Sequence, residues 1–132
     1  MKRIGLVISF ALMTISMAAG TISVVPGSGA LSAAIRQAQA GDVLLLADGP
    51  YDESSNIIIS TPLTICAAEG AAPVLKAGGR IEVKADLRVV GLSIVTSSAG
   101  EAFRLQPGEE IYSLYLEGCT IQGFSSKTIR VY

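Results

Sequence analysis

Apolar and polar side chains largely alternate along residues 87–94, and the same pattern returns along residues 114–121. The apolar positions of the two segments coincide when one is set over the other: Leu87 with Leu114, Val89 with Leu116, Leu92 with Cys119 and Ile94 with Ile121. A shorter copy, Leu63-Thr-Ile65, lies a similar distance before the first segment. Alternation of this kind is typical of β-strands, and its return at this spacing predicts a solenoid of stacked repeats.

A second family of short strands repeats between these segments. It has the form apolar-x-apolar and begins at Ile57, Ile81, Phe103 and Ile129, in nearly equal steps. Two strand families in constant order predict an all-β fold, a right-handed parallel β-helix of about four coils, because a β-sandwich would not keep that order. The expected strands cover residues 21–25, 42–46, 57–59, 63–65, 74–75, 81–83, 87–94, 103–105, 114–121 and 129–131.

One helix is expected, over residues 30–40, where apolar side chains recur at helical spacing. Ser28 is the predicted N-cap and Gly41 the residue that ends the helix, and residues 47–50 predict a turn after the next strand. Because the first coil of a β-helix exposes an apolar cross-section, we expect this amphipathic helix to cap it. The alternative is a helix packed on the side of a small α+β domain.

Residues 1–20 have the features of a secretory signal peptide. Lys2 and Arg3 precede an apolar run over residues 4–17, and residues 16–20 offer small side chains at the −3 and −1 spacing that signal peptidase needs. A membrane anchor is the alternative, but the run is shorter than the ~20 residues that a spanning helix needs. We therefore expect a mature domain over residues 21–132 that is secreted, periplasmic or on the cell surface, with no stable membrane span after cleavage.

Composition agrees with thin stacked coils more than with a core of large rings. The chain has 132 residues, of which half are hydrophobic and 5% aromatic, with 14 Gly and no Trp. The net charge is −1, and no basic stripe with interleaved aromatics is present, which argues against a nucleic-acid partner.

The chain contains no histidine, which excludes a Cys–His nucleophile and a His-based zinc site. Cys66 and Cys119 are the only cysteines. The repeat places them two coils apart, beyond the span of a disulfide, so we expect two free, largely buried thiols.

Equivalent residues of a parallel β-helix form rows along its axis, and two outward rows contain candidate ligand-binding residues. One row is Thr64, Arg88 and Tyr115, and the other is Glu82, Arg104 and Arg130. A guanidinium beside a tyrosine ring could bind an acidic sugar through its carboxylate or sulfate. The alternative is a solvated face on which Glu82 and Arg104 pair across coils. The candidate substrate-binding residues are Arg88, Tyr115, Lys84 and Arg104.

The segment from Leu31 to Tyr51 resembles the opening of pectate-lyase-like β-helix proteins, with a capping helix of the form L-x-x-A-I-x-x-A-x-x-G-D, a strand, and then x-x-G-x-Y. Residues 62–65 and 89–92 are similar to the chondroitinase B and alginate lyase branch, and residues 113–132 to uncharacterised secreted bacterial β-helix proteins. The resemblance implies polysaccharide lyases that use a Lys or Arg base, often with Ca²⁺.

No residue is assigned a catalytic or metal-binding role. The acidic residues Asp48, Asp52 and Glu53 do not fall beside Lys84 and Arg88, and Glu109-Glu110 has the sequence of a polar turn.

Three functions remain open. The leading hypothesis is a domain that binds or presents to polysaccharide, with acidic polymers among the expected partners. One alternative is the N-terminal portion of an active lyase that cleaves uronate polymers by β-elimination. The other is a structural or adhesive surface module. Residues 129–132 fall in the middle of a coil, so either another molecule covers that edge or residues 21–132 are the N-terminal part of a longer β-helix domain. We favour the second.

Overall fold

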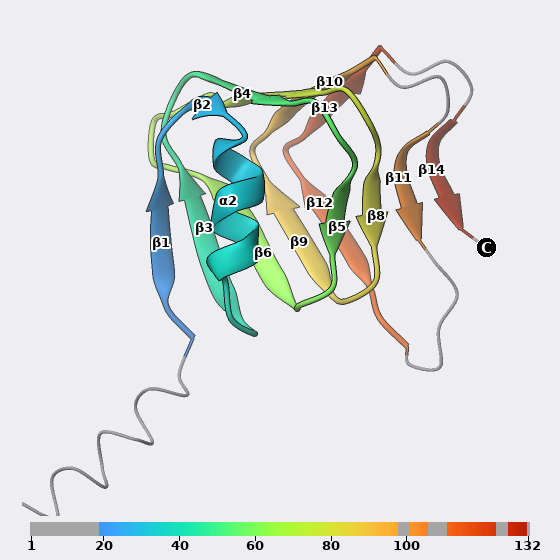
Figure 1. Cartoon of the computed structure of the whole chain (residues 1–132), viewed down its shortest axis with the longest axis horizontal. Coiled ribbons are helices and arrows are strands. Elements are labelled where there is room, and N and C mark those ends of the chain that lie inside the picture. Colours follow the sequence, from blue (N-terminus) through green and yellow to red (C-terminus); the bar gives the residue numbers. More distant parts are fainter. Residues whose placement is uncertain (1–18, 98–100, 106–110, 124–126, 132) are drawn as a thin grey trace, which may run out of the picture.

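The computed structural model describes residues 19–97, 101–105, 111–123 and 127–131, and it confirms the predicted β-helix. Every strand pair is parallel, and successive strands rotate through three sheets (Figure 1). The first sheet contains β1 (Thr21–Val24), β3 (Asp42–Leu46), β6 (Leu63–Ala67), β9 (Leu87–Val90) and β12 (Leu114–Glu117). The second contains β2 (Gly27–Ser28), β4 (Pro50–Glu53), β7 (Val74–Ala77), β10 (Ser93–Thr96) and β13 (Thr120–Gln122). The third contains β5 (Ile57–Ile59), β8 (Ile81–Val83), β11 (Glu101–Leu105) and β14 (Lys127–Val131).

The repeated segments stack in the predicted register, but each is two strands rather than one. Leu87 lies opposite Leu63 on one side and Leu114 on the other. Gly91 has a φ of 76°, which turns the chain from β9 in the first sheet to β10 in the second. Since Leu92 directly after this corner is buried again, the apolar pattern resumes at once and hides the bend in the sequence. The strands expected at residues 74–75 and in the second halves of the repeated segments belong to the second sheet, but they were not recognised as a separate strand family. The strands β2 and β4 were missed, and β4 begins at Pro50 inside the expected turn.

The core is a stack of inward side chains from all three sheets. Its fully buried members, less than 2% exposed, include Leu44, Leu46, Tyr51, Ile59, Leu75, Val83, Val89, Ile94 and Phe103. Burying one such side chain contributes about 1.5–3 kcal/mol. The hydroxyl of Tyr51 lies 2.9 Å from the carbonyl oxygen of Val24 and 2.7 Å from that of Ala47, so the one large polar ring of the core has partners.

The helix α2 (Ala30–Gln37) caps the start of the core, as expected. It lies between β2 and β3 in the chain, and so takes the place of the first strand of the third sheet (Figure 1). Leu31 and Ala34 are buried, and the helix packs on β1, β2 and β4, while Arg36 faces solvent. No helix among the described residues is long and apolar enough to cross a membrane. Of the predicted signal peptide, residues 1–20, the first 18 residues lie outside the described ranges.

The ends of α2 differ from the prediction. The N-cap is Gly29 and not Ser28, and its position has no side-chain cap. The carboxylate of Glu53, on β4, instead accepts hydrogen bonds from the backbone N–H groups of Leu31 at 3.2 Å and Ser32 at 3.4 Å. A cap from the next coil cannot be recognised from the sequence next to the helix.

The helix is also shorter at its C-terminal end. Ala38 is extended, and Gly41 forms part of the turn into β3. The side chain of Asp42 accepts backbone N–H hydrogen bonds from Gln39 and Gly20, both at 2.8 Å. These bonds, the one from Gln39 first, hold the pKa of Asp42 below its ordinary value despite its burial. Asp42 thus fixes the connection between the cap and the first sheet.

Both thiols are free, as predicted, but they are half-buried rather than largely buried. Cys66 lies at an outward position of β6, opposite Val90. Cys119 packs against the core, and its Sγ lies 3.4 Å from the carbonyl oxygen of Val89. The described residues place no further strand beyond β12 and β13, so Cys119 is covered from one side.

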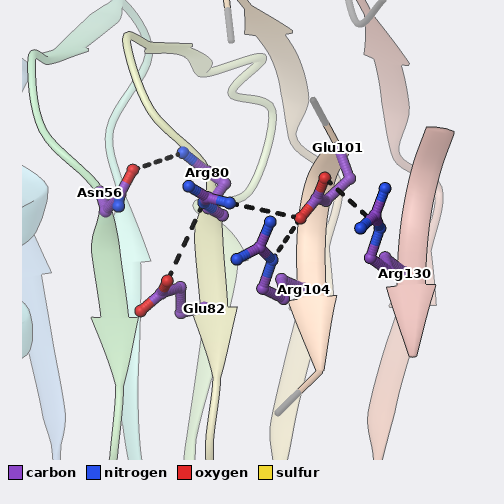
Figure 2. Close-up of polar contacts among 6 residues, drawn as sticks. All are labelled: Asn56, Arg80, Glu82, Glu101, Arg104 and Arg130. Carbon is purple, nitrogen blue, oxygen red and sulfur yellow. Dashed lines mark hydrogen bonds and ion pairs between the residues drawn. The ribbon is translucent and has the colours of Figure 1, made fainter. Parts of the chain in front are cut away.

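Three arginines from successive coils surround one carboxylate on the third sheet (Figure 2). Glu101, at the first position of β11, is 1% exposed. Arg104 donates a hydrogen bond to it through Nε, while Nη1 of Arg80 lies 3.5 Å and Nε of Arg130 3.8 Å from its oxygens. Arg80 also lies 3.9 Å from Glu82. The cluster ties β8, β11 and the following β14 together through charge.

The hydrogen bond from Arg104 outweighs the effect of burial and lowers the pKa of Glu101 below its ordinary value of 4.5. The backbone of Glu101 and the charges of Arg104 and Arg130 act in the same direction. A carboxyl group whose pKa is lowered by folding stabilises the fold fully above its unfolded pKa. That stabilisation is lost as the pH falls through the folded pKa.

We predict that Glu101→Gln lowers the free energy of unfolding at neutral pH by about 1–3 kcal/mol, because three guanidinium groups lose their shared carboxylate. The stability of the variant should also fall less steeply than that of the wild type below pH 4.5. Urea unfolding across this pH range measures both effects. Glu82→Gln is the control, with an expected loss below about 1 kcal/mol. Equal losses in the two variants would contradict a central role for Glu101.

Candidate functional site

The outward row on the first sheet forms as predicted. Arg88 lies opposite Thr64 on β6 and opposite Tyr115 on β12. Side chains one coil apart on a parallel sheet are about 4.8 Å apart, so neighbouring members of a row can contact one another. Strand register alone therefore brings a guanidinium and an aromatic ring together.

Arg88 and Tyr115 stack with a favourable geometry. The guanidinium carbon lies 4.8 Å from the centroid of the tyrosine ring, within the range of a cation–π contact. Glu117 accepts a hydrogen bond from the Tyr115 hydroxyl at 2.9 Å, and Nη2 of Arg88 lies 3.4 Å from the same carboxylate. About half of the Arg88 side chain and half of Tyr115 are exposed.

Glu117 favours the protonated form of the Tyr115 phenol. Its hydrogen bond and its negative charge raise the pKa of Tyr115 above the ordinary value of 10.0, while Arg88 acts in the opposite direction. A phenol is protonated at neutral pH even at its ordinary pKa, and in this form its hydroxyl group can donate a hydrogen bond. Arg88 and Tyr115 together suit binding of a negatively charged, ring-shaped ligand more than proton abstraction.

A shallow hollow of about 250 Å³ opens beside this pair. Its lining includes Thr64, Asp86, Arg88, Ser113 and Tyr115. The Asp86 side chain accepts hydrogen bonds from the backbone N–H of Ser113 at 2.7 Å and from its hydroxyl at 3.3 Å, which fixes that wall. The hollow thus combines a cation, an aromatic ring and hydroxyl groups with one carboxylate, that of Asp86, which is engaged by Ser113.

The other two candidate residues lie elsewhere. Lys84 follows β8 in a turn rather than in a strand, and lines a neighbouring hollow of about 160 Å³ that also includes Asp86. Arg104 lies on the third sheet opposite Glu82 and Arg130, as the second row predicted, but its side chain bonds to Glu101. The structure therefore brings Arg88 and Tyr115 into contact. Lys84 lies in the connection between the third and first sheets, and Arg104 lies on the third sheet, apart from the other three.

The acidic residues considered from the sequence have separate roles. Asp48 accepts a hydrogen bond from the backbone N–H of Ala72 at 2.9 Å, in agreement with its predicted turn role. Glu53 caps α2, and Asp52 is exposed. Glu109-Glu110 lies outside the described residues. Within the ranges that the structure describes, no three Asp, Glu, Cys or His side chains are grouped to hold a metal ion.

A larger hollow of about 420 Å³ on the second sheet was not predicted. Asp52 of β4 lies opposite Lys76 of β7 within it. The two residues are as far apart in the chain as Leu63 and Leu87 of the repeated segments. The spacing indicates that Asp52 and Lys76 lie in register on adjacent coils. It has this meaning only if both residues are assigned to strands of the second sheet.

Comparison with known proteins agrees with this architecture. The structure of an alginate lyase of the PL6 family, AlyGC, superposes with a TM-score of 0.75 and 27% sequence identity over 85% of this chain. A mutant of the same enzyme gives a TM-score of 0.71 and 28% identity over 85% of this chain. No family model and no curated protein matches the sequence.

The matched region spans about a fifth of the length of those enzymes, 18% and 19% of the two chains. Over that length the superposition confirms the resemblance to pectate-lyase-like proteins and the predicted handedness. The chain is a polysaccharide-lyase-like right-handed parallel β-helix.

Proposed function

We propose that this domain binds an acidic polysaccharide on the face of its first sheet, with Arg88 and Tyr115 as the central contacts. The observation that carries the proposal is the guanidinium stacked 4.8 Å from a half-exposed tyrosine ring, beside a hollow of about 250 Å³. A guanidinium binds a carboxylate with two parallel hydrogen bonds, and an aromatic ring packs against the face of a sugar.

The present partner of Arg88 does not prevent such binding. Glu117 and Arg88 are each 53% exposed in their side chains, and an exposed ion pair contributes only about 0–1 kcal/mol. A carboxylate of the polymer can therefore replace Glu117 at little cost. Arg104 differs, because its partner Glu101 is buried. For this reason we place the ligand on the first sheet.

The predicted signal peptide and the proposed polysaccharide ligand both favour a location outside the cytoplasm. An exported domain meets polysaccharides of the cell surface or the surroundings, and its likeness to an alginate lyase makes alginate a suitable first ligand. We propose a secreted, periplasmic or surface location on these grounds.

Arg88→Ala is predicted to weaken alginate binding about tenfold or more, since it removes the charge-assisted hydrogen bonds to the uronate carboxylate. Tyr115→Ala should weaken it as well, through loss of the ring. Isothermal titration of the full-length protein with alginate measures both effects. Arg36→Ala, which removes an exposed guanidinium from α2, is the matched control.

Unchanged affinity in Arg88→Ala and Tyr115→Ala would refute the proposed face. Absence of binding to alginate, pectin and chondroitin sulfate by the wild type would favour the structural or adhesive module.

The second candidate function is the N-terminal portion of an active polysaccharide lyase. The likeness to an alginate lyase over 85% of this chain favours it. In β-elimination, a base removes the proton on the carbon next to the uronate carboxylate. The electron pair then forms a carbon–carbon double bond, and the glycosidic oxygen leaves with a proton. Such an enzyme needs residues beyond those assigned here, and Ca²⁺ could neutralise the carboxylate.

A lyase assay separates the two functions. If the protein binds polysaccharide without cleaving it, the full-length protein should release no unsaturated ends from alginate, pectin or chondroitin sulfate, either with Ca²⁺ or with a chelator present. Ultraviolet absorbance of the unsaturated product is the measurement. A clear rise that depends on protein concentration would establish the lyase and refute the binding-only function.

A further inference from the structure

The hollow on the second sheet, of about 420 Å³, is larger than the Arg88–Tyr115 hollow of about 250 Å³ and shares no lining residue with it. Its lining residues lie at the C-terminal ends of β2, β4, β7 and β10 and in the turns that follow β4, β7 and β10. Its volume lies within the range of small-ligand sites, about 300–1,000 Å³. The question is which ligand its lining fits.

The outer wall of the hollow is a single row of residues in register. Ser28 lies opposite Asp52, Asp52 opposite Lys76, and Lys76 opposite Val95. Three steps between neighbouring strands span roughly 14 Å along the axis of the β-helix. The hollow is therefore elongated along the direction in which the coils stack.

The two charged side chains of this row lie next to each other without pairing. Among the described residues, neither Asp52 nor Lys76 makes a side-chain hydrogen bond or an ion pair, although their positions are opposite in adjacent strands. Both are exposed. A ligand in the hollow would thus find an ammonium group and a carboxylate that are both available.

The floor of the hollow is fixed by contacts within the fold. Glu53 is 4% exposed, and its carboxylate is used by the N-terminus of α2. A Cβ at Gly78 would lie 3.0 Å from the carbonyl oxygen of Ser54, so the two turns at the rim pack closely. The backbone N–H of Ser97 bonds to the carbonyl of Ala77 at 3.0 Å, which continues the rim into the next coil.

These features select among classes of ligand. A divalent cation needs several oxygen ligands, but Glu53 is engaged and Asp52 is the one available carboxylate of the lining. DNA has phosphates along its backbone but no hydroxyl group there that could donate to Asp52, so it would use Lys76 alone. A sugar unit with one carboxylate and several hydroxyl groups satisfies both residues, together with the hydroxyls of Ser28, Ser54 and Ser97.

We infer that this hollow is a second saccharide subsite, which holds a uronate unit of the polymer. The ammonium of Lys76 binds the carboxylate of the sugar, and Asp52 with the serine hydroxyls binds the sugar hydroxyls. The choice of a uronate rests on the proposed function. Because Arg88 and Lys76 lie on different sheets, the two contacts can be tested separately.

The test uses the full-length protein and a short oligoguluronate, titrated by calorimetry against four proteins: the wild type, Lys76→Met, Arg88→Ala and the double variant. We expect Lys76→Met to weaken binding about five- to tenfold in both the wild-type and the Arg88→Ala background. Arg36→Met, which removes an exposed cation from α2, should leave the affinity unchanged. A neutral maltooligosaccharide of equal length should bind at least about tenfold more weakly than the oligoguluronate.

The outcomes of the two proposals are distinct. If Arg88→Ala weakens binding and Lys76→Met does not, the subsite on the second sheet is refuted while the proposed function stands. If Lys76→Met weakens binding and Arg88→Ala does not, the subsite stands and the face on the first sheet is refuted. Equal binding of the neutral sugar would overturn the assignment of a uronate. Because Lys76 is exposed, its variant should unfold at the wild-type temperature, which excludes misfolding as the cause.

Discussion

The stacking of equivalent residues in parallel register is the constraint on which the rest of this structure depends. Each inward side chain must fill the space above its counterpart one coil earlier, as Leu63, Leu87 and Leu114 do. This stacking places parallel strands of successive coils about 4.8 Å apart, which is the distance at which their backbones form hydrogen bonds. The same register also arranges the outward residues in rows, so the rule that builds the core also determines which polar groups can meet.

The strand stacking and the rows of outward residues could be predicted from the sequence, because both follow from the register. Contacts that long side chains make between coils could not be predicted. The offset between the repeated segments was enough to place Tyr115 beside Arg88. The corner at Gly91 was hidden because the apolar pattern resumes directly after it, so the strands at residues 74–75 and 93–94 were expected but were not recognised as one sheet. The hollow at Lys76 was missed for the same reason. The cap on α2 by Glu53, and the meeting of Glu101 with Arg80 and Arg130, join residues from different coils through long side chains, whose directions a strand pattern does not specify.

The exposure of the partner carboxylate distinguishes two groups of arginines. Some surround the buried Glu101, whereas Arg88 lies beside the exposed Glu117 and is accessible to solvent. Glu101 is removed from water, so its arginines replace the lost hydration, and displacing them would leave a buried charge unpaired. Glu117 remains exposed beside Arg88, and water can replace either partner. Two clusters with similar chemistry thus differ in how far their carboxylate is exposed, which is 2% of the side chain for Glu101 and 53% for Glu117.

The connections between the first and second sheets differ in length from coil to coil, and this shows where the fold tolerates insertions. The chain passes from β9 to β10 through residues 91–92, but from β6 to β7 through residues 68–73, and Val74 still pairs with Pro50 and Ser93. The longer connection is held by Asp48 of the preceding coil, which binds the backbone N–H of Ala72. Loops can therefore grow at this corner without shifting any strand. A longer connection at this corner adds surface between two sheets, while the coils on either side keep their register.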